Sequence, residues 1–192
     1  MRVSAMKAGL WAAAVVLGCG ITARAAEGYK VDPDHSSVTF KIEHSGISWI
    51  HGRFNDVAGE FSVDEANPPA SSFALTMKTG SVDTANKKRD EHLASPDFFN
   101  AKQFPVLSFK STSVKKTDNG LEVTGDLTLH GETKPVTFLL RGGKTAEFPK
   151  GTKRVGYTTH FKLKRSDFGM HTGMEFLGDD VYIEISFQGV KS

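Results

Sequence analysis

The chain has 192 residues, and its formal charge is +2, from 24 Lys and Arg against 22 Asp and Glu. Without residues 1–25 the balance would be 21 basic against 22 acidic residues, which gives no electrostatic footprint for nucleic acid. The only cysteine, Cys19, lies in that same segment, so the rest of the chain can form neither a disulfide nor a thiol site.

The first 25 residues have the pattern of an export signal. Arg2 and Lys7 are followed by an apolar run at 8–20 and by a small-x-small cleavage site at 23–25. An uncleaved membrane anchor is the alternative, but the run is shorter than the roughly 20 residues that a span needs. Val-Leu-Gly-Cys at 16–19 matches a lipoprotein processing site poorly, so we do not expect lipidation of Cys19. We therefore predict a cleaved signal peptide at 1–25, no transmembrane anchor and a periplasmic or secreted protein.

Residues 26–192 are expected to form one domain, since 167 residues suit a single core and no linker or low-complexity tract interrupts them. Apolar and polar residues alternate in most of this region, which indicates strands with one dry face. About eight strands are expected, at residues 38–42, 61–63, 73–77, 107–109, 121–129, 136–140, 161–163 and 181–187.

Residues 81–109 are the one stretch without this alternation. Thr84 can cap a short helix through Ala94, on which Arg89, His92 and Leu93 share one face. Ser-Pro-Asp at 95–97 reads as a second helix start, and three phenylalanines follow at 98, 99 and 104. We predict that this segment is a short helical lid resting on the apolar interior of a curved sheet.

Meandering antiparallel strands allow a sandwich or a barrel. The chain has 14 phenylalanines, most of them on predicted apolar faces, and a small barrel can hold one ligand or be filled by its own side chains. We favour an all-β, eight-stranded antiparallel lipocalin-like barrel with an apolar cavity. A solid core of the same rings is the alternative from pattern alone.

An ordered set of short motifs resembles the YceI-like family of bacterial periplasmic proteins across the whole of 26–192. The motifs are YKVDPDHS at 29–36, HSG at 44–46, GRF at 52–54, SVDT at 81–84, RDEHL at 89–93, DFF at 97–99, FP at 104–105, GDLTLHG at 125–131, RSDFG at 165–169 and GDDV at 178–181. The resemblance implies a lipocalin-like barrel that holds a polyisoprenoid or similar long-chain amphiphile in its lumen, often as a homodimer.

We therefore expect a binding protein with no cofactor, no metal and no catalytic residues, which transports, stores or scavenges its ligand, the last as a stress response. Ligand candidates are an isoprenoid quinone or its precursor, a polyprenyl phosphate and a fatty amide. The expected inward tail contacts are Phe40, Phe73, Leu75, Leu107, Phe109, Leu127, Leu129, Phe138, Phe161 and Ile183, and the expected lid contacts are Leu93, Phe98, Phe99, Phe168, Met170 and Met174.

Arg89, His92 and Arg165 are candidates to meet a phosphate, phenol or quinone oxygen. Each arginine also has a structural interpretation, which we favour. In it, Arg89 joins Asp90 or Glu91 in a solvated charged face, and Arg165 pairs with Asp167 across a turn.

Seven histidines prompt the main alternative function, a metal-dependent periplasmic enzyme. None of them stands in a metal-ligand motif. Asp34, His35 and Ser36 have the residue types of a catalytic triad, but neighbours on an extended chain point to opposite faces of a strand and cannot relay a proton. A third possibility is an adhesion module built as a sandwich, which would contain no cavity and carry no lipid.

Overall fold

The computed structural model describes residues 26–192, so the predicted signal peptide and Cys19 lie outside the described residues. The strands are β1 (Glu27–His44), β2 (Ser48–Phe54), β3 (Val57–Val63), β4 (Ser72–Lys78), β5 (Val82–Asp83), β6 (Val106–Thr117), β7 (Gly120–Leu129), β8 (Glu132–Glu147), β9 (Lys153–Lys164) and β10 (Leu177–Lys191). One α-helix, α1 (Lys87–Leu93), and three short 3-10 turns, η1 (Pro68–Ala70), η2 (Thr79–Ser81) and η3 (Arg165–Phe168), complete the fold.

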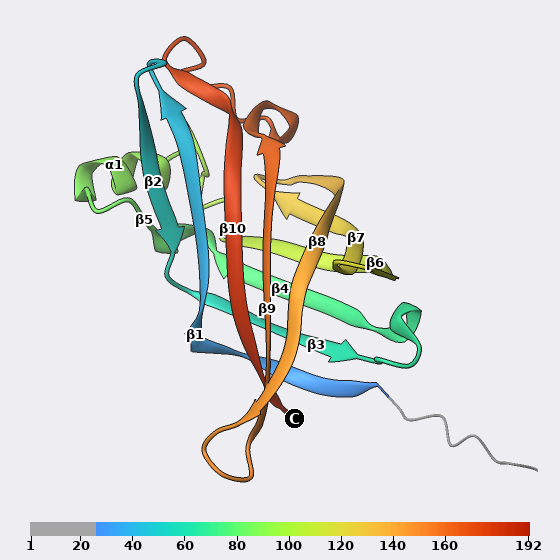
Figure 1. Cartoon of the computed structure of the whole chain (residues 1–192). Coiled ribbons are helices and arrows are strands. Elements are labelled where there is room, and N and C mark those ends of the chain that lie inside the picture. The colour runs from blue at the N-terminus through green and yellow to red at the C-terminus, as the bar shows by residue number, and fades with distance from the viewer. Residues whose placement is uncertain (1–25) are drawn as a thin grey trace, which may run out of the picture.

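Eight of these strands close an antiparallel barrel in the order β1-β3-β4-β6-β7-β8-β9-β10, and β10 returns to pair with β1 (Figure 1). The closing pair runs nearly the full length of both strands, from Tyr29 opposite Lys191 to His44 opposite Leu177. The predicted eight-stranded antiparallel barrel is confirmed. Closure leaves these eight strands no open sheet edge along most of their length.

Strand β1 has two different neighbours on its other side. Residues 27–30 pair with β3, whereas residues 38–44 pair with β2. A register shift between Asp32 and Ser37 separates the two halves. On its other edge, β2 pairs with β5 only at Arg53 and Phe54. The rest of that edge has no strand partner among the described residues, so the barrel wall is incomplete there. The end of the barrel that carries the β1–β2 turn is called the open end below, and the other end is called the closed end.

The segment between β5 and β6 covers this incomplete wall, and α1 lies beside β2 in Figure 1. The helix is shorter than predicted, because the Asn86 side chain, not that of Thr84, caps it by accepting from the backbone N–H of Arg89 at 3.0 Å. The predicted second helix at Ser95 is wrong. Instead the backbone N–H groups of Phe98 and Asn100 both donate to the Ser95 carbonyl in a tight turn.

Candidate ligand-binding site

A cavity of about 310 Å³ occupies the half of the barrel nearest the open end. This volume lies at the lower end of the range of about 300–1,000 Å³ found for ligand pockets. Its wall consists of inward side chains from eight strands: Val38, Phe40, Ile42, Ile50, Phe54, Leu75, Met77, Leu107, Phe109, Leu127, Leu129, Val136, Phe138, Phe161, Leu163, Val181, Ile183 and Ile185. The lining is therefore almost entirely apolar.

The burial of inward residues changes along the barrel and locates the cavity. On β9, Val155 and Tyr157 are buried, whereas Phe161 and Leu163 are half-buried. On the neighbouring β10, Phe187 is buried and Ile183 is half-buried. The half-buried side chains point inward but face empty space, because they border the cavity. The barrel is thus solid toward its closed end and hollow toward its open end.

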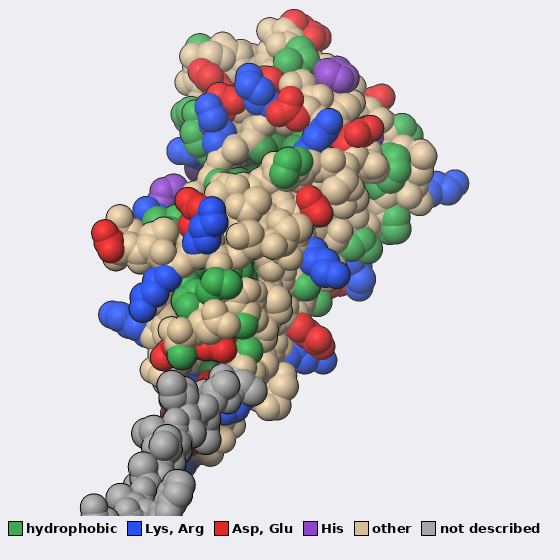
Figure 2. All heavy atoms as spheres, turned by 90° about the vertical axis from the view of Figure 1, so that its right-hand side faces the viewer, with side chains coloured by type: hydrophobic (Ala, Val, Ile, Leu, Met, Phe, Trp, Pro, Cys, Tyr) green, Lys and Arg blue, Asp and Glu red, His purple; other side chains and the backbone are tan. Residues whose placement is uncertain are grey.

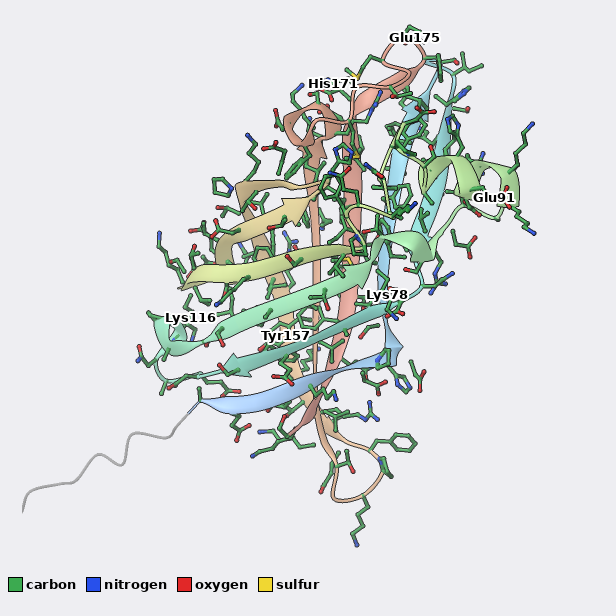
Figure 3. All side chains as sticks on the ribbon, turned by 180° about the vertical axis from the view of Figure 1, so that it is seen from behind. Lys78, Glu91, Lys116, Tyr157, His171 and Glu175 are labelled. Carbon is green, nitrogen blue, oxygen red and sulfur yellow. The ribbon has the colours of Figure 1, made fainter. Side chains whose placement is uncertain are left out.

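A cluster of aromatic rings fills the closed half and forms the floor of the cavity. Phe61 stacks between Tyr29 and Phe73 with ring centroids 5.2 and 5.6 Å away, and it meets Phe187 edge-on at 5.3 Å. Tyr157 packs edge-on against Phe73 at 5.9 Å, and Figure 3 shows it well inside the strands. Burial raises the pKa of Tyr157 to about 12. The two predicted alternatives, solid core and lumen, each describe one half of this barrel.

The first cover of the cavity is the segment that contains α1. Arg89, His92 and Leu93 share the helix face that lines the cavity, as their spacing predicts. The Arg89 guanidinium is held in place by Thr84, whose side-chain oxygen accepts from Nε at 2.7 Å and whose carbonyl accepts from Nη2 at 2.8 Å. Thr84 is itself fixed, because its hydroxyl donates to Asp90 at 2.5 Å.

Phenylalanines attach this cover to the barrel. Phe99 packs edge-on against Phe54 of β2, with ring centroids 5.5 Å apart. Phe98 is buried and meets the His92 ring edge-on at 5.0 Å, and His92 Nε2 lies 2.9 Å from a carboxylate oxygen of Asp97. His92 is therefore held by an aromatic ring on one side and a carboxylate on the other, and the predicted helical lid is confirmed as a covering segment.

The second cover is the loop between η3 and β10, and Arg165 organises it. The side chain is only 3% exposed and donates to the carbonyls of Met170, Thr172, Leu177 and Gly178 at 2.7–3.3 Å. Burial lowers the pKa of Arg165, although Asp179 and Glu175 oppose this shift. The predicted pair with Asp167 is wrong, since these donors go to the loop backbone.

The mouth of the cavity lies between the two covers. Three of the lining residues, His92, Thr172 and Phe176, are exposed to solvent and therefore border the opening. Among the described residues that line the cavity, the ionisable ones are Arg89, His92, Arg165 and His44, and none is a carboxylic acid. The ionisable groups that a ligand would meet here are consequently two arginines and two histidines.

The structure brings most of the predicted contact residues together. Thirteen of the sixteen predicted apolar contacts line the cavity, and so do all three polar candidates. The exceptions are Phe73, which lies in the floor cluster, Phe168, which is the buried last residue of η3, and Met174, which points to solvent with 42% exposure. Whether the lining residues contact a ligand stays a prediction.

Several lining residues were absent from the predicted set. Ile42 and Met77 continue the alternation that identified Phe40 and Leu75, so their pattern was sufficient to find them. His44 is the last residue of β1 and Phe176 lies in a loop, where no period marks the inward face. The remaining additions are Val38, Thr39, Ile50, Phe54, Val136, Leu163, Thr172, Leu177, Val181 and Ile185.

Within residues 26–192, no group of three His, Cys, Asp or Glu side chains is arranged to hold a metal ion. His130, for example, lies with Nδ1 3.0 Å from the Phe168 carbonyl and its ring 5.0 Å from Phe104. His35 lies 2.9 Å from the Asp32 carboxylate in the register shift of β1. In the same range, no helix is long and apolar enough to cross a membrane.

Comparison with known proteins identifies the family of this barrel. The YceI-like domain model matches residues 29–189. Protein YceI of Escherichia coli is 43% identical over 165 residues, which cover 85% of this chain and 86% of that protein. Two solved structures share the fold. BcnA of Burkholderia cenocepacia matches with a TM-score of 0.73 and 24% identity, over 82% of this chain and 98% of that one. A polyisoprenoid-binding domain from Saccharophagus degradans matches with a TM-score of 0.65 and 16% identity, over 85% of this chain and 98% of that one. The chain belongs to the YceI-like domain family.

Proposed function

We propose that this protein binds one long-chain amphiphile, with the tail in the cavity and the head group at the mouth, and that it does so in the periplasm after export. The observation that carries the proposal is a cavity with an almost entirely apolar lining, whose ionisable lining residues come from the two covers and the end of β1. A polyisoprenoid is the tail we favour, because the Saccharophagus degradans domain of the same fold is a polyisoprenoid-binding domain.

The energetics suit a long tail. Each buried methylene contributes about 0.8 kcal/mol, and association costs about 4–15 kcal/mol in lost freedom. A tail of about twenty carbons would therefore be needed for firm binding. Because the cavity is small for such a tail, we expect the two covers to move apart when the ligand enters. Binding of this kind needs no catalytic group.

The head group should be an anion or a neutral hydrogen-bond acceptor. Arg89 and His92 face the cavity near the mouth, and no carboxylate lines it among the described residues. The Arg89 Nε and Nη2 groups already donate to Thr84, which leaves Nη1 available for a ligand oxygen. A phosphate, carboxylate or quinone oxygen fits this site, whereas an amine would find no carboxylate in the described lining and would lie near the Arg89 guanidinium.

Native mass spectrometry of protein purified from its own periplasm tests the proposal, together with solvent extraction of whatever is released. We expect an adduct of long-chain mass at one ligand per chain. To test loading directly, the extracted protein is mixed with geranylgeranyl phosphate. An empty protein that also fails to take up this probe would contradict the proposal.

A pair of leucines provides a matched control for the site. Leu129 lines the cavity, whereas Leu139 points away from it on the outer face of β8. Leu129→Trp should sharply reduce probe occupancy and keep a folded β-rich spectrum, because the indole fills the tail space. Leu139→Trp introduces the same ring outside the barrel and should bind the probe as the unmodified protein does.

The head-group preference has its own measurement. Geranylgeranyl phosphate and geranylgeranylamine share a tail and differ in charge. We expect the phosphate to bind at least tenfold more tightly, and Arg89→Gln to reduce that ratio. Equal affinities for the two compounds would show that the tail alone determines binding.

A further inference from the structure

Apolar side chains project into solvent at the open end. Ile47, at the turn between β1 and β2, is 86% exposed, and Met174 and Phe176 of the η3–β10 loop are also exposed. We call these three residues the apolar tip. Figure 2 shows hydrophobic side chains at the surface of this upper end, beside acidic and basic ones, and Figure 3 shows Glu175 at its extremity. Exposed apolar clusters of this kind mark interaction surfaces.

The apolar tip is held in place by backbone hydrogen bonds. The Ser45 N–H donates to the Phe176 carbonyl at 2.6 Å, which joins the β1–β2 turn to the η3–β10 loop. Gly173 has a φ of +71°, and a side chain there would collide with the Phe176 ring. The ring therefore packs closely over the loop backbone and keeps its outer surface in solvent. The exposure of Phe176 is thus a fixed feature of the fold.

Below the apolar tip, an amphipathic girdle formed by Lys41, Trp49, Lys162 and Tyr182 lies on the outer face of β1, β2, β9 and β10. Trp49 meets Tyr182 edge-on at 5.4 Å, and the Lys41 amine lies 4.8 Å above the Trp49 ring and 5.5 Å from that of Tyr182. Lys162 lies 5.9 Å from Tyr182 on the other side. Ile47, Met174 and Phe176 at the extremity, with Trp, Tyr and Lys behind them, follow the polarity of a bilayer from its acyl chains to its phosphates.

We propose that the open end docks on a lipid bilayer, with the apolar tip at the boundary between the headgroups and the acyl chains, where Glu175 can stay hydrated, and the girdle at the phosphates. The proposal rests on the proposed function, because Phe176 belongs both to the apolar tip and to the cavity mouth, so docking places the mouth against the source of a lipophilic ligand. The Lys41 amine lies over the Trp49 and Tyr182 rings, and its charge is complementary to the phosphates.

The charges near the open end also predict how docking responds to salt. Lys162 pairs with Asp180 at 2.7 Å and Lys164 with Asp179 at 3.3 Å, and Glu43 and Glu175 add negative charge. The region is therefore not a basic patch. Insertion of apolar surface should supply most of the affinity, so docking should occur on zwitterionic lipid and weaken little as salt rises.

The test uses vesicles of palmitoyl-oleoyl phosphatidylcholine, with and without phosphatidylglycerol, and protein purified from the periplasm, from which the predicted cleavage removes residues 1–25. Trp49 is then the only tryptophan, because the other of the two, Trp11, lies in that segment. We expect the protein to float with the vesicles and Trp49 emission to shift to the blue. Lipid with a doxyl quencher near the headgroup should quench Trp49 more strongly than lipid with the quencher near the chain end.

The matched variants lie at opposite ends of the barrel. Ile47→Asp should reduce the floated fraction about tenfold and abolish the emission shift. Phe148→Asp, in the β8–β9 loop at the closed end (Figure 1), removes a side chain that is 70% exposed and should float as the unmodified protein does. Equal losses in both variants, or no flotation of the unmodified protein, would overturn the proposal.

Two further measurements separate the possible failures. Native mass spectrometry of the same preparations reports bound amphiphile, so a loaded protein that ignores vesicles overturns docking and leaves the proposed function standing. Sedimentation velocity reports self-association. A dimer that depends on Ile47, without vesicle binding, would assign the apolar tip to a second copy of the chain and overturn the bilayer proposal.

Discussion

The Arg165 guanidinium donates a 2.7 Å hydrogen bond to the carbonyl of Thr172, which borders the cavity mouth. Its other donors reach three more carbonyls of the same loop and its end. One buried cation therefore fixes the segment that carries Phe176. This geometry supports the structural interpretation of Arg165, even though the residue also lines the cavity.

Replacing Arg165 should accordingly destabilise the fold. Arg165→Met leaves four carbonyls without their donor, and Arg165→Lys cannot reach them all from a single ammonium group. We expect the free energy of unfolding of each variant, measured in urea, to be lower by at least about 2 kcal/mol. Lys164→Met, which removes an exposed pair with Asp179, should change stability by less than about 1 kcal/mol. An Arg165→Met variant with full stability and no ligand binding would instead make Arg165 a head-group contact.

The alternation of apolar residues was sufficient to predict the barrel, because inward residues of a strand must be apolar whatever their partners. The same pattern could not separate Phe73 from Phe161. Both are inward phenylalanines on regular strands, yet Phe73 is buried in the floor cluster and Phe161 borders the cavity. Their difference depends on how far each lies from the open end, and that distance is set by strand register between segments far apart in sequence.

The covers were harder to predict, because their residues obey no period. Phe168 and Met174 were both expected to contact ligand, but η3 turns Phe168 into the core and the following loop turns Met174 into solvent. Arg165 was paired with Asp167 from sequence proximity, whereas its partners are carbonyls that become available only when the loop folds over it.

A glycine on β2 provides a way to narrow the cavity without substituting any residue of its lining. A Cβ at Gly52 would lie 2.3 Å from the tip of the Phe40 ring on β1, so Gly52→Ala must push that ring inward. We expect reduced uptake of geranylgeranyl phosphate with a modest loss of stability, because the ring can move into the cavity. At Gly189 the same substitution meets the Phe61 ring and Tyr29 in the solid half. Compared with Gly52→Ala, Gly189→Ala should lower the melting temperature more and the probe occupancy less. The reverse order would contradict the division of the barrel into a solid closed half and a hollow open half.

Truncation of inward phenylalanines should show the same division as a difference in stability. Phe73→Ala opens a void among packed rings and should cost about 3–5 kcal/mol. Phe161 already borders empty space and retains packing mainly through its stack with Phe138 at 5.1 Å. Phe161→Ala should therefore cost roughly 1–2 kcal/mol. Urea unfolding of ligand-free protein provides the measurement, and equal costs would mean that the cavity is filled by side-chain motion in solution.

A salt bridge between β1 and β9 should make stability sensitive to acid. Asp32 lies in the register shift of β1 and forms a salt bridge with Arg154 of β9, and it also accepts from the Asp34 N–H and contacts His35. The Arg154 side chain, with smaller contributions from the other two groups, lowers the pKa of Asp32 to about 2. Because the folded-state pKa lies below the ordinary value of 3.8, this stabilisation is present above about pH 4 and is lost as the pH falls toward 2.

We therefore expect Asp32→Asn to lower the free energy of unfolding by roughly 1–3 kcal/mol at neutral pH and to matter progressively less below pH 4. Asp34→Asn changes a neighbouring exposed carboxylate in the same segment and serves as the control. Urea midpoints of the unmodified protein and both variants, measured from pH 2 to pH 7, provide the comparison. Only the contribution of the Asp32 charge can disappear as the carboxylate is protonated. A constant difference in stability between Asp32→Asn and the unmodified protein across that range would therefore mean that Asp32 contributes through the shape of its side chain and its hydrogen bonds.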